Sequence, residues 1–330
     1  MSLTAAAIQD IEAGIAGGDR RMLAKGITLV ESHRKQDTGA AQHILEKVMN
    51  QTGRSVRVGI TGVPGVGKST FIETLGMQLI GHGHRIAVLA VDPSSPRSGG
   101  SILGDKTRMP ALSMRPEAFI RPSPAGGIHG GVAGKTRETM LLCEAAGYDV
   151  ILVETVGVGQ AEVEVASMVD FFMVLLLPGA GDALQGIKKG IIELADMLVI
   201  NKADGDNLPA ARLAKREYEQ ALHLLRTGTD CIELCSSVTG DGISRVWDEV
   251  NEYIRKGKQT GHFETKRRDQ LYGWMTRMTE EAVLQDFRED DRMRNALAAF
   301  RSQLEKGETT PVIARNKLLN LYRKISADRI

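Results

Sequence analysis

The segment between residues 62 and 70 carries the clearest chemistry in the sequence. It reads Gly62, Val63, Pro64, Gly65, Val66, Gly67, Lys68, Ser69 and Thr70, which matches the phosphate-loop pattern G-x-x-x-x-G-K-[ST]. The glycines let several backbone N–H groups face one anion. Lys68 can reach the β- and γ-phosphates of a nucleotide, and the Ser69 hydroxyl can bind Mg²⁺. The segment therefore predicts a binding site for a nucleoside triphosphate.

A second segment indicates which base this site takes. It reads Asn201, Lys202, Ala203 and Asp204, an N-K-x-D sequence. A carboxylate at Asp204 can accept from both the ring N1–H and the exocyclic amine of guanine. Adenine presents an acceptor at N1, and unpaired buried polar groups are costly, so the discrimination is strong. We expect Asn201 to connect this loop to the phosphate loop and the stem of Lys202 to cover the base. The predicted base is guanine.

A third segment, Ser236, Ser237 and Val238, follows a predicted strand. It either closes over guanine O6 or forms an ordinary turn.

Three acidic residues lie where a Mg²⁺ site would need oxygen ligands. Asp92 follows a predicted strand, Asp105 lies in a glycine-rich polar segment, and Glu154 ends another strand. Many GTPases carry D-x-x-G where this chain has Glu154-Thr155-Val156-Gly157, so the glutamate is a departure; it can still hold a metal-bound water. The N–H of Gly157 is expected to contact the γ-phosphate. For each acid the alternative is a helix cap or a surface turn.

The sequence is less informative about catalysis. Gln160 is a candidate for positioning the attacking water, and Lys188, Arg108 or an arginine from a partner could supply positive charge in the transition state. We therefore expect slow intrinsic turnover that a partner raises. The segment 178–188 is either a further nucleotide-dependent switch or only a turn.

Alternating strand and helix patterns must position these segments. Strands are predicted at 56–61, 85–91, 118–121, 149–155, 170–177, 196–200 and 230–235. Helices are predicted at 69–80, 134–147, 185–194, 208–226 and 243–256. This alternation predicts an α/β fold with a mostly parallel sheet and helices on both faces. Ligands of such folds bind beyond the carboxyl ends of the strands, where these segments fall.

The expected domains are an N-terminal helical extension (1–52), a phosphate-loop domain (53–257) and a C-terminal helical region (258–330) that begins with a polar connector at 258–261. The first extension is expected to serve packing or partner binding. The chain has 330 residues and a formal net charge of +1, so no strong field points to nucleic acid. Three cysteines and no long apolar run predict a cytoplasmic protein that is not in a membrane. Cys231 and Cys235 are expected to be buried strand residues rather than metal ligands.

With these residues assembled, the chain closely resembles the MeaB/ArgK/MMAA family of phosphate-loop GTPases. The resemblance covers nearly the whole chain and is carried by residues 62–70, 91–96, 99–108, 154–160 and 201–204. The middle three of these stretches are much more specific than general GTPase motifs. Within this family a glutamate at position 154 is expected.

The resemblance implies a function and a set of partners. Family members are GTPase chaperones of adenosylcobalamin-dependent methylmalonyl-CoA mutase or its relatives; they gate cofactor loading, protect the mutase and help to exchange damaged cofactor. By resemblance, the ligands are Mg²⁺ with GTP or GDP, and the chain forms a homodimer through its C-terminal helices. Matching positions imply Mg²⁺ contacts from Ser69, Asp92, Asp105 and Glu154. The segment 178–188 resembles an additional family switch that couples partner binding to hydrolysis.

Other functions remain open at this point. A metallochaperone-type GTPase for another metalloenzyme would be expected to carry a Cys/His delivery cluster, which this sequence lacks. A kinase would be expected to carry an aspartate loop that activates a hydroxyl. A nucleotide-gated binding module without meaningful hydrolysis is a further alternative.

Overall fold

The computed structural model describes residues 4–32, 34–91, 108–123, 131–155, 161–179, 189–225 and 231–328. The chain divides into two compact units, Met1–Gln270 and Leu271–Ile330. The first unit contains the phosphate loop, and the second consists of helices.

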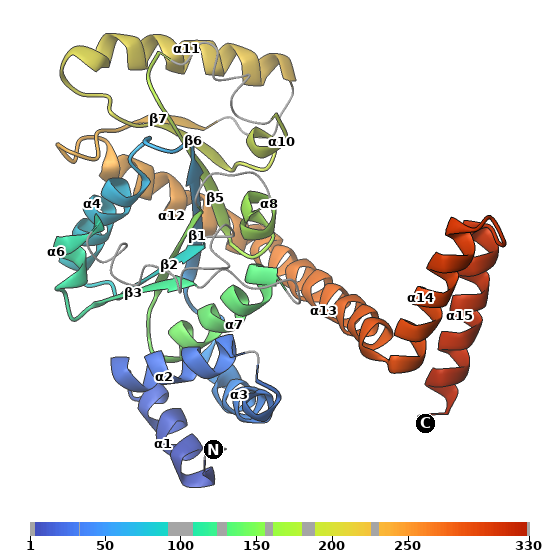
Figure 1. Ribbon diagram of the computed structural model, residues 1–330. Coiled ribbons are helices and arrows are strands. Elements are labelled where there is room, and N and C mark those ends of the chain that lie inside the picture. The colour runs from blue at the N-terminus through green and yellow to red at the C-terminus, as the bar shows by residue number, and fades with distance from the viewer. Residues whose placement is uncertain are drawn as a thin grey trace. The chain divides into compact units, whose positions relative to one another are not determined.

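The first unit is built on a sheet that has seven strands over the described ranges (Figure 1). The strands are β1 Val56–Gly62, β2 Ile86–Val91, β3 Ala118–Ser123, β4 Val150–Thr155, β5 Phe171–Leu176, β6 Met197–Ile200 and β7 Ile232–Leu234. Their spatial order is β3-β2-β4-β1-β5-β6-β7, and each neighbouring pair is parallel. The predicted fold class and strands are confirmed, with strand ends that differ by at most two residues.

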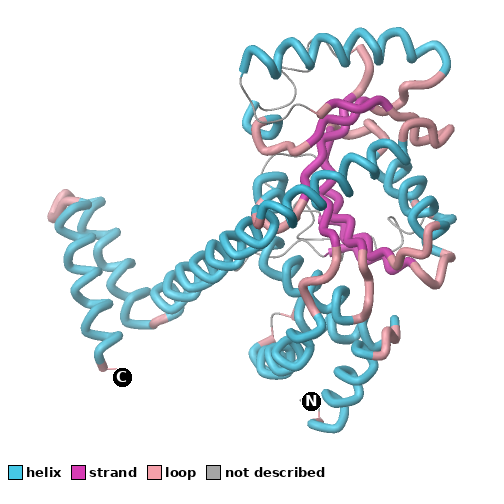
Figure 2. The backbone as a smooth tube through the Cα atoms, turned by 180° about the vertical axis from the view of Figure 1, so that it is seen from behind, coloured by secondary structure: helices cyan, strands magenta, loops and turns pink. Residues whose placement is uncertain are grey.

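Helices cover both faces of this sheet (Figure 2). One face carries α7 Gly131–Ala145, α8 Ala161–Ala166, α10 Lys189–Ile192 and α11 Leu208–Leu225. The other face carries α4 Lys68–Gly81, α6 Pro110–Ser113 and α12 Ile243–Thr260. The sequence did not predict α6 and α8, because four and six residues are too few for helical periodicity to be read.

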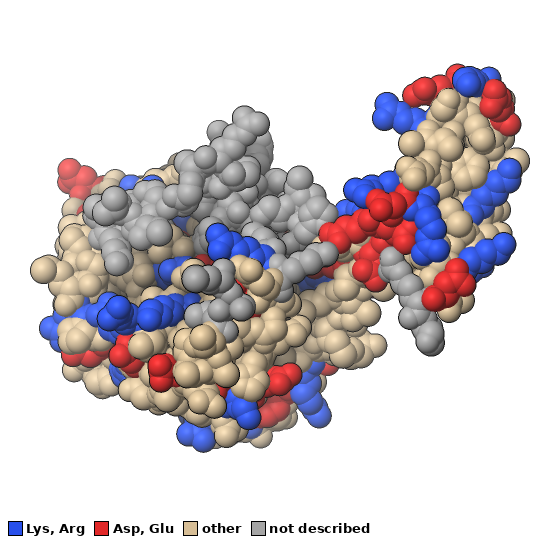
Figure 3. Space-filling model, turned by 60° about the horizontal axis from the view of Figure 1, so that its bottom comes forward, with Lys and Arg blue, Asp and Glu red and all other residues tan. Residues whose placement is uncertain are grey.

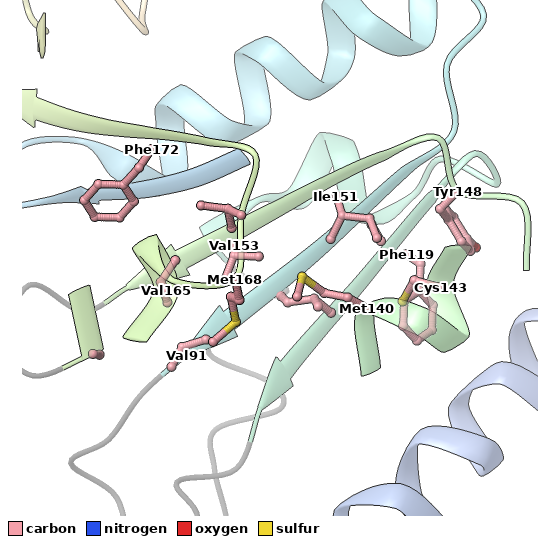
Figure 4. Close-up of a cluster of buried hydrophobic side chains, with 14 of the residues drawn as sticks. Val91, Phe119, Met140, Cys143, Tyr148, Ile151, Val153, Val165, Met168 and Phe172 are labelled. Atoms are coloured by element: carbon pink, nitrogen blue, oxygen red, sulfur yellow. The ribbon is translucent and has the colours of Figure 1, made fainter. Parts of the chain in front are cut away.

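The strands are apolar on both sides because both sides are covered. In β4, Ile151 and Val153 belong to the cluster under α7 and α8, whereas Val150 and Leu152 belong to the cluster under α4 and α12. Figure 4 shows part of the first cluster, in which Phe172 lies with Val153 and Val165. Alternate residues of one strand thus anchor helices on opposite faces.

The N-terminal extension packs against the outside of α7. It consists of α1 Ala5–Ala16, α2 Arg20–Glu31, α3 Lys35–Val48 and the short 3₁₀ helix η1 Met49–Gln51. Ile15, Leu23 and Ile27 are completely buried and share a cluster with Leu142 of α7. The helical periodicity read from the sequence therefore marks a buried face.

The connector predicted at 258–261 is mostly helical. α12 continues to Thr260, and only Gly261 leaves the helix, with a φ of 73° in the left-handed region that glycine tolerates. The next helix, α13 His262–Glu289, begins at once and runs into the second unit. Polar composition alone does not end a helix whose residues are good helix formers.

An ion pair and two backbone hydrogen bonds fix the first turns of α13 to the amino ends of the strands. The guanidinium of Arg267 donates to both carboxylate oxygens of Asp170, at 2.7 and 2.6 Å. It also donates to the carbonyls of Gly53 and Ser55, each at 2.6 Å. The Asp170 side chain is 1% exposed and also accepts from the backbone N–H of Arg57 at 2.8 Å, so this planar cation is the counter-ion of a buried, hydrogen-bonded carboxylate.

Glu144 of α7 lies in the same region. Burial alone would raise the pKa of Glu144, but bonds from Arg57, Gly53 and Ser55 outweigh burial and hold the pKa below its ordinary value. Because the pKa is lowered on folding, this stabilisation is present at neutral pH and is lost as the pH falls through the folded-state pKa.

Arg137 of α7 connects two further elements at this end of the unit. Its guanidinium donates to the carbonyl of Ser167, directly after α8, at 2.6 Å and to the carbonyl of Gln270 in α13 at 2.9 Å. The residue is 6% exposed.

The second unit consists of the rest of α13 with α14 Asp291–Glu305 and α15 Pro311–Ala327. The rings of Phe287 and Tyr322 pack edge to face with centroids 5.4 Å apart. Few apolar side chains of this unit are buried; among the described residues they are Met293, Ala314 and Ile325.

The surface shows no strong charge preference on the face in Figure 3, where the coloured acidic and basic side chains are interspersed. Among the described residues, no helix combines the length and the hydrophobicity that crossing a bilayer requires.

Replacing Arg267 by methionine is expected to lower the free energy of unfolding of the first unit by about 3 kcal/mol, because the buried Asp170 carboxylate loses its counter-ion. Urea denaturation followed by circular dichroism measures this change. The matched control is Arg268→Met, since Arg268 is exposed; it should change the value by less than about 0.5 kcal/mol. Equal effects of the two substitutions would contradict the role assigned to the ion pair.

Candidate nucleotide site

The predicted motifs meet at the carboxyl edge of the sheet. The phosphate loop joins β1 to α4, Glu154 is the fifth residue of β4, and Asn201 directly follows β6. Ser236 lies two residues after β7. Because all strands are parallel, these positions lie at the same end of the sheet.

Two glycines of the phosphate loop are required by close contacts. Gly62 has a φ of 151°, and a Cβ there would lie 2.5 Å from the carbonyl oxygen of Leu175. Gly67 has a φ of 97°, and a Cβ there would lie 2.7 Å from Nδ2 of Asn201. The loop therefore reaches its turn only without side chains at these positions.

Lys68 opens α4 and is largely buried, with 9% of its surface exposed. Its ammonium donates to the carbonyls of Gly62 and Val63, at 2.8 and 3.3 Å. Burial lowers the pKa of Lys68, whereas the carboxylates of Glu154 and Glu162 oppose this shift. The cation is thus held over the loop that would cradle phosphates.

The donor set next to Lys68 fits Mg²⁺. The Ser69 hydroxyl donates to Oε1 of Glu154 at 3.1 Å, which brings together two oxygen atoms that could bind a metal at the start of α4. Glu154 is 8% exposed and pairs in register with Ile60 of β1. Hydroxyl and carboxylate oxygens are the ligands that Mg²⁺ prefers.

Glu162 of α8 is a residue that the sequence analysis missed. It is completely buried, and its charge acts on Lys68, while the neighbouring Val163 is 54% exposed. Carboxylates are usually exposed and valines are usually buried, so the burial of these two neighbouring residues is the reverse of the usual pattern. The signal was visible only as the acidic sequence Ala161-Glu162-Val163-Glu164, which does not reveal which glutamate faces inward.

Asn201 connects the N-K-x-D loop to the phosphate loop, as predicted, and it also binds the segment after β7, which was not predicted. Its Nδ2 donates to the Val66 carbonyl at 2.8 Å. Its Oδ1 accepts from the backbone N–H of Ser237 at 3.0 Å and from the Ser237 hydroxyl at 2.8 Å. The thiol of Cys235 donates to the same oxygen at 3.5 Å. Asn201 is 1% exposed, so its amide is satisfied entirely within the protein.

The rest of the N-K-x-D loop is less buried than Asn201: Lys202 is exposed, and Ala203 and Asp204 are partly buried. Lys202 has a φ of 60°, which is the left-handed conformation and the only positive φ at a non-glycine residue among those described. Its side chain is exposed. The carboxylate of Asp204 accepts a bond from the Ser236 hydroxyl, which in turn accepts from the N–H of Thr239 at 3.1 Å. Ser236 thus fixes the direction of the Asp204 carboxylate.

The two predicted cysteine positions differ in burial. Cys235 is 2% exposed, as expected, but Cys231 is only partly buried, and the two cysteines flank β7 instead of lying in it. Burial raises the pKa of the Cys235 thiol to about 12, so it acts as a neutral hydrogen-bond donor.

Several predicted site residues lie outside the described residues: Asp92, Asp105, Gly157, Gln160 and Lys188. Arg108 is described and exposed, and its charge contributes to the lowered pKa of Lys68.

This arrangement agrees with a known family. The sequence model described as "Methylmalonyl Co-A mutase-associated GTPase MeaB" matches residues 23–292. The chain belongs to the MeaB family. By family and by fold it is a phosphate-loop GTPase, which confirms the resemblance seen in the sequence.

Relatives and one solved structure extend the match over most of the chain. The chain is 49% identical over 271 residues to GTPase ArgK of Escherichia coli K12, covering 81% of this chain and 82% of the relative. It is 44% identical over 324 residues to the Mus musculus "Methylmalonic aciduria type A homolog, mitochondrial", covering 94% and 78%. The crystal structure of an LAO/AO transport system kinase aligns with a TM-score of 0.77 and 35% identity, covering 98% of this chain and all of that one.

Replacing Lys68 by alanine is expected to weaken the binding of a non-hydrolysable GTP analogue about a hundredfold, because charged hydrogen bonds to phosphate are lost. Isothermal titration calorimetry measures this affinity. Lys47→Ala, which removes an exposed lysine from α3, is the control and should bind as the unmodified protein does. Normal affinity of the Lys68 variant would show that the loop does not hold the phosphates.

Proposed function

We propose that the MeaB-family site at the carboxyl edge of the sheet hydrolyses GTP to GDP and phosphate. The backbone of residues 62–70 cradles the phosphates, and Lys68 contacts the β- and γ-phosphates. The support is the convergence of the buried lysine, the Ser69–Glu154 pair and the start of α4 at one point.

We propose that guanine binds beside Asn201, Lys202 and Asp204. The Asp204 carboxylate accepts from N1–H and the exocyclic amine, and the exposed stem of Lys202 covers the ring. Ser236, Ser237 and Val238 close over O6. The bond from Ser236 to Asp204 supports this role, because it holds the carboxylate in one orientation before any base binds.

The proposed metal ligands are two described residues, Ser69 and Glu154, and two residues from the sequence motifs that lie outside the described ranges. Ser69 and Glu154 would hold Mg²⁺, together with Asp92 and Asp105, and the backbone of Gly157 would contact the γ-phosphate. A Mg²⁺ ion held by these residues would supply positive charge to the phosphate oxygens. Lys68 stabilises the transition state, Gln160 positions water, and Lys188 in the segment 178–188 adds positive charge when a partner binds.

The biological role proposed is that of a chaperone for methylmalonyl-CoA mutase. In this proposal GTP hydrolysis gates the loading of adenosylcobalamin, protects the mutase and helps to reactivate it. The observation that carries the proposal is the match of residues 23–292 to a family named as mutase-associated. The name of the Mus musculus relative refers to methylmalonic aciduria, which supports a role connected with methylmalonyl-CoA mutase.

Adding adenosylcobalamin-dependent methylmalonyl-CoA mutase is expected to raise the GTP turnover of this protein at least tenfold, as partners that complete a GTPase site do. The measurement is the release of phosphate under single-turnover conditions, with and without the mutase. The control is the Lys68→Ala variant with the same mutase preparation, which reports contaminating hydrolysis. Tight GTP binding without any acceleration would remove this mutase as the activating partner and favour the metallochaperone alternative.

We further propose that two copies pair through the second unit. Apolar side chains there are exposed at helical spacing along α13, including Leu271 (53%), Met275 (56%) and Met278 (44%). α14 and α15 add further exposed apolar residues, among them Leu297, Val312 and Ile313. A unit with so few buried side chains gains stability when its apolar surface is covered, and a second copy is the partner that the resemblance indicates.

Introducing charge at this surface with Met275→Asp and Met278→Asp together is expected to convert the dimer into monomers, because two carboxylates would be buried without partners. Sedimentation velocity gives the mass at each concentration. Arg277→Asp, an exposed position on the other side of α13, should leave the mass unchanged. A dimer that survives the double substitution places the interface elsewhere.

The cytoplasmic location stays a prediction from the sequence, as does the absence of nucleic-acid and membrane partners.

A further inference from the structure

The backbone of Ser237 is held from two sides. On one side its N–H and its hydroxyl donate to Oδ1 of Asn201, at 3.0 and 2.8 Å. On the other side its carbonyl oxygen accepts from the hydroxyl of Thr74 in α4, at 2.6 Å. Ser237 is 5% exposed, so little solvent competes for these groups. Its peptide groups therefore have little freedom to rotate.

The bond from Thr74 is unusual for a helical threonine. Such hydroxyls ordinarily donate to the carbonyl four residues earlier in the same helix. Thr74 instead reaches a carbonyl 163 residues away in the chain. One turn later, Oε1 of Gln78 accepts from the Ser244 hydroxyl of α12 at 3.1 Å. Residues i and i+4 lie on the same side of a helix, so Thr74 and Gln78 share one side of α4. This side contacts Ser237, in the segment after β7, and Ser244, at the start of α12.

The carbonyl of Ser237 and the N–H of Val238 belong to one peptide group. In a trans peptide these two bonds point in opposite directions, and the described chain has no cis peptide. With the carbonyl directed at Thr74, the N–H of Val238 points away from α4. Val238 is 82% exposed, and within the described residues its N–H has no acceptor. It is a fixed donor that faces away from α4, and Ser236, two residues earlier, binds the Asp204 carboxylate.

We propose that Thr74 is a positioning residue for guanine recognition: its hydroxyl orients the 237–238 peptide so that the Val238 N–H meets guanine O6. This proposal rests on the guanine site proposed above and adds a residue outside the nucleotide motifs. The same helix begins at Lys68, so α4 fixes both the phosphate end and the base end of the site. The distance between these two ends is then set by the length of helix from Lys68 to Thr74.

The test compares GDP with 6-thio-GDP, in which sulfur, a weaker acceptor, replaces O6. Thr74→Val removes the hydroxyl and keeps the shape of the side chain, and Thr74→Ser is the matched control that keeps the hydroxyl. Affinities of the unmodified protein and of both variants are measured by calorimetry. Thermal melting without nucleotide checks that each variant is folded.

Thr74→Val should weaken GDP about five- to tenfold, the size of one lost hydrogen bond, and should weaken 6-thio-GDP much less. The preference for GDP over 6-thio-GDP therefore falls in Thr74→Val and persists in Thr74→Ser. Equal weakening of both ligands would overturn the proposal, because a purely structural role does not distinguish O6 from S6. Loss of the preference in Thr74→Ser would also overturn it, because the hydroxyl is still present there.

A second arm separates this proposal from the guanine site itself. Asp204→Asn changes the acceptor that reads N1–H and the amine, so it should shift the preference from GDP to xanthosine diphosphate. If Asp204→Asn keeps the guanine preference, the proposed base site is wrong whatever Thr74 does. If the preference shifts and Thr74→Val weakens both probes equally, the base site stands and the role of Thr74 fails.

Discussion

The geometry of the site depends on the side chain of Asn201. A single buried amide binds the Val66 carbonyl of the phosphate loop and both the N–H and the hydroxyl of Ser237. If this side chain were lost, several buried polar groups would be unpaired at once, and such groups are costly in a low-dielectric interior. Gly67 has no room for a Cβ because Nδ2 of Asn201 already lies there. The contact between the two loops therefore needs both a glycine at position 67 and the asparagine 134 positions later in the chain.

The parts of the site that could be predicted from the sequence are those with local signals. Strand alternation placed the sheet, and the rule that ligands bind at carboxyl ends placed Lys68, Glu154 and Asn201 together. Glu162 was not predicted, because periodicity cannot distinguish two glutamates within one short helix. Thr74 was not predicted, because nothing in the sequence of an apolar helix indicates that its threonine has a hydrogen-bond partner 163 residues away. Contacts across the chain are set by tertiary packing, which single-sequence patterns do not contain.

The anchoring of α13 could not be predicted either, because it also depends on contacts between residues far apart in the chain. Arg267 and Asp170 are separated by 97 positions, and neither lies in a recognisable motif. The polar composition near residue 258 suggested a connector, but α12 continues through it and the compact units divide after Gln270. Here the Arg267–Asp170 ion pair, rather than the polarity of the intervening residues, decides where the chain is held. Composition predicted the existence of a helical C-terminal region without its point of attachment.

Arg137 has a consequence for how this part of the molecule opens. Its guanidinium is planar, and its donors are fixed relative to one another. It binds Ser167 after α8 and Gln270 in α13 at the same time, and it is almost fully buried. Local unfolding of either helix end would leave a buried cation with unpaired donors. Fraying of one helix end therefore also destabilises the folded state of the other helix end. The end of α8 and the first turns of α13 therefore behave as one cooperative unit in native-state fluctuations, although 103 positions separate Ser167 from Gln270.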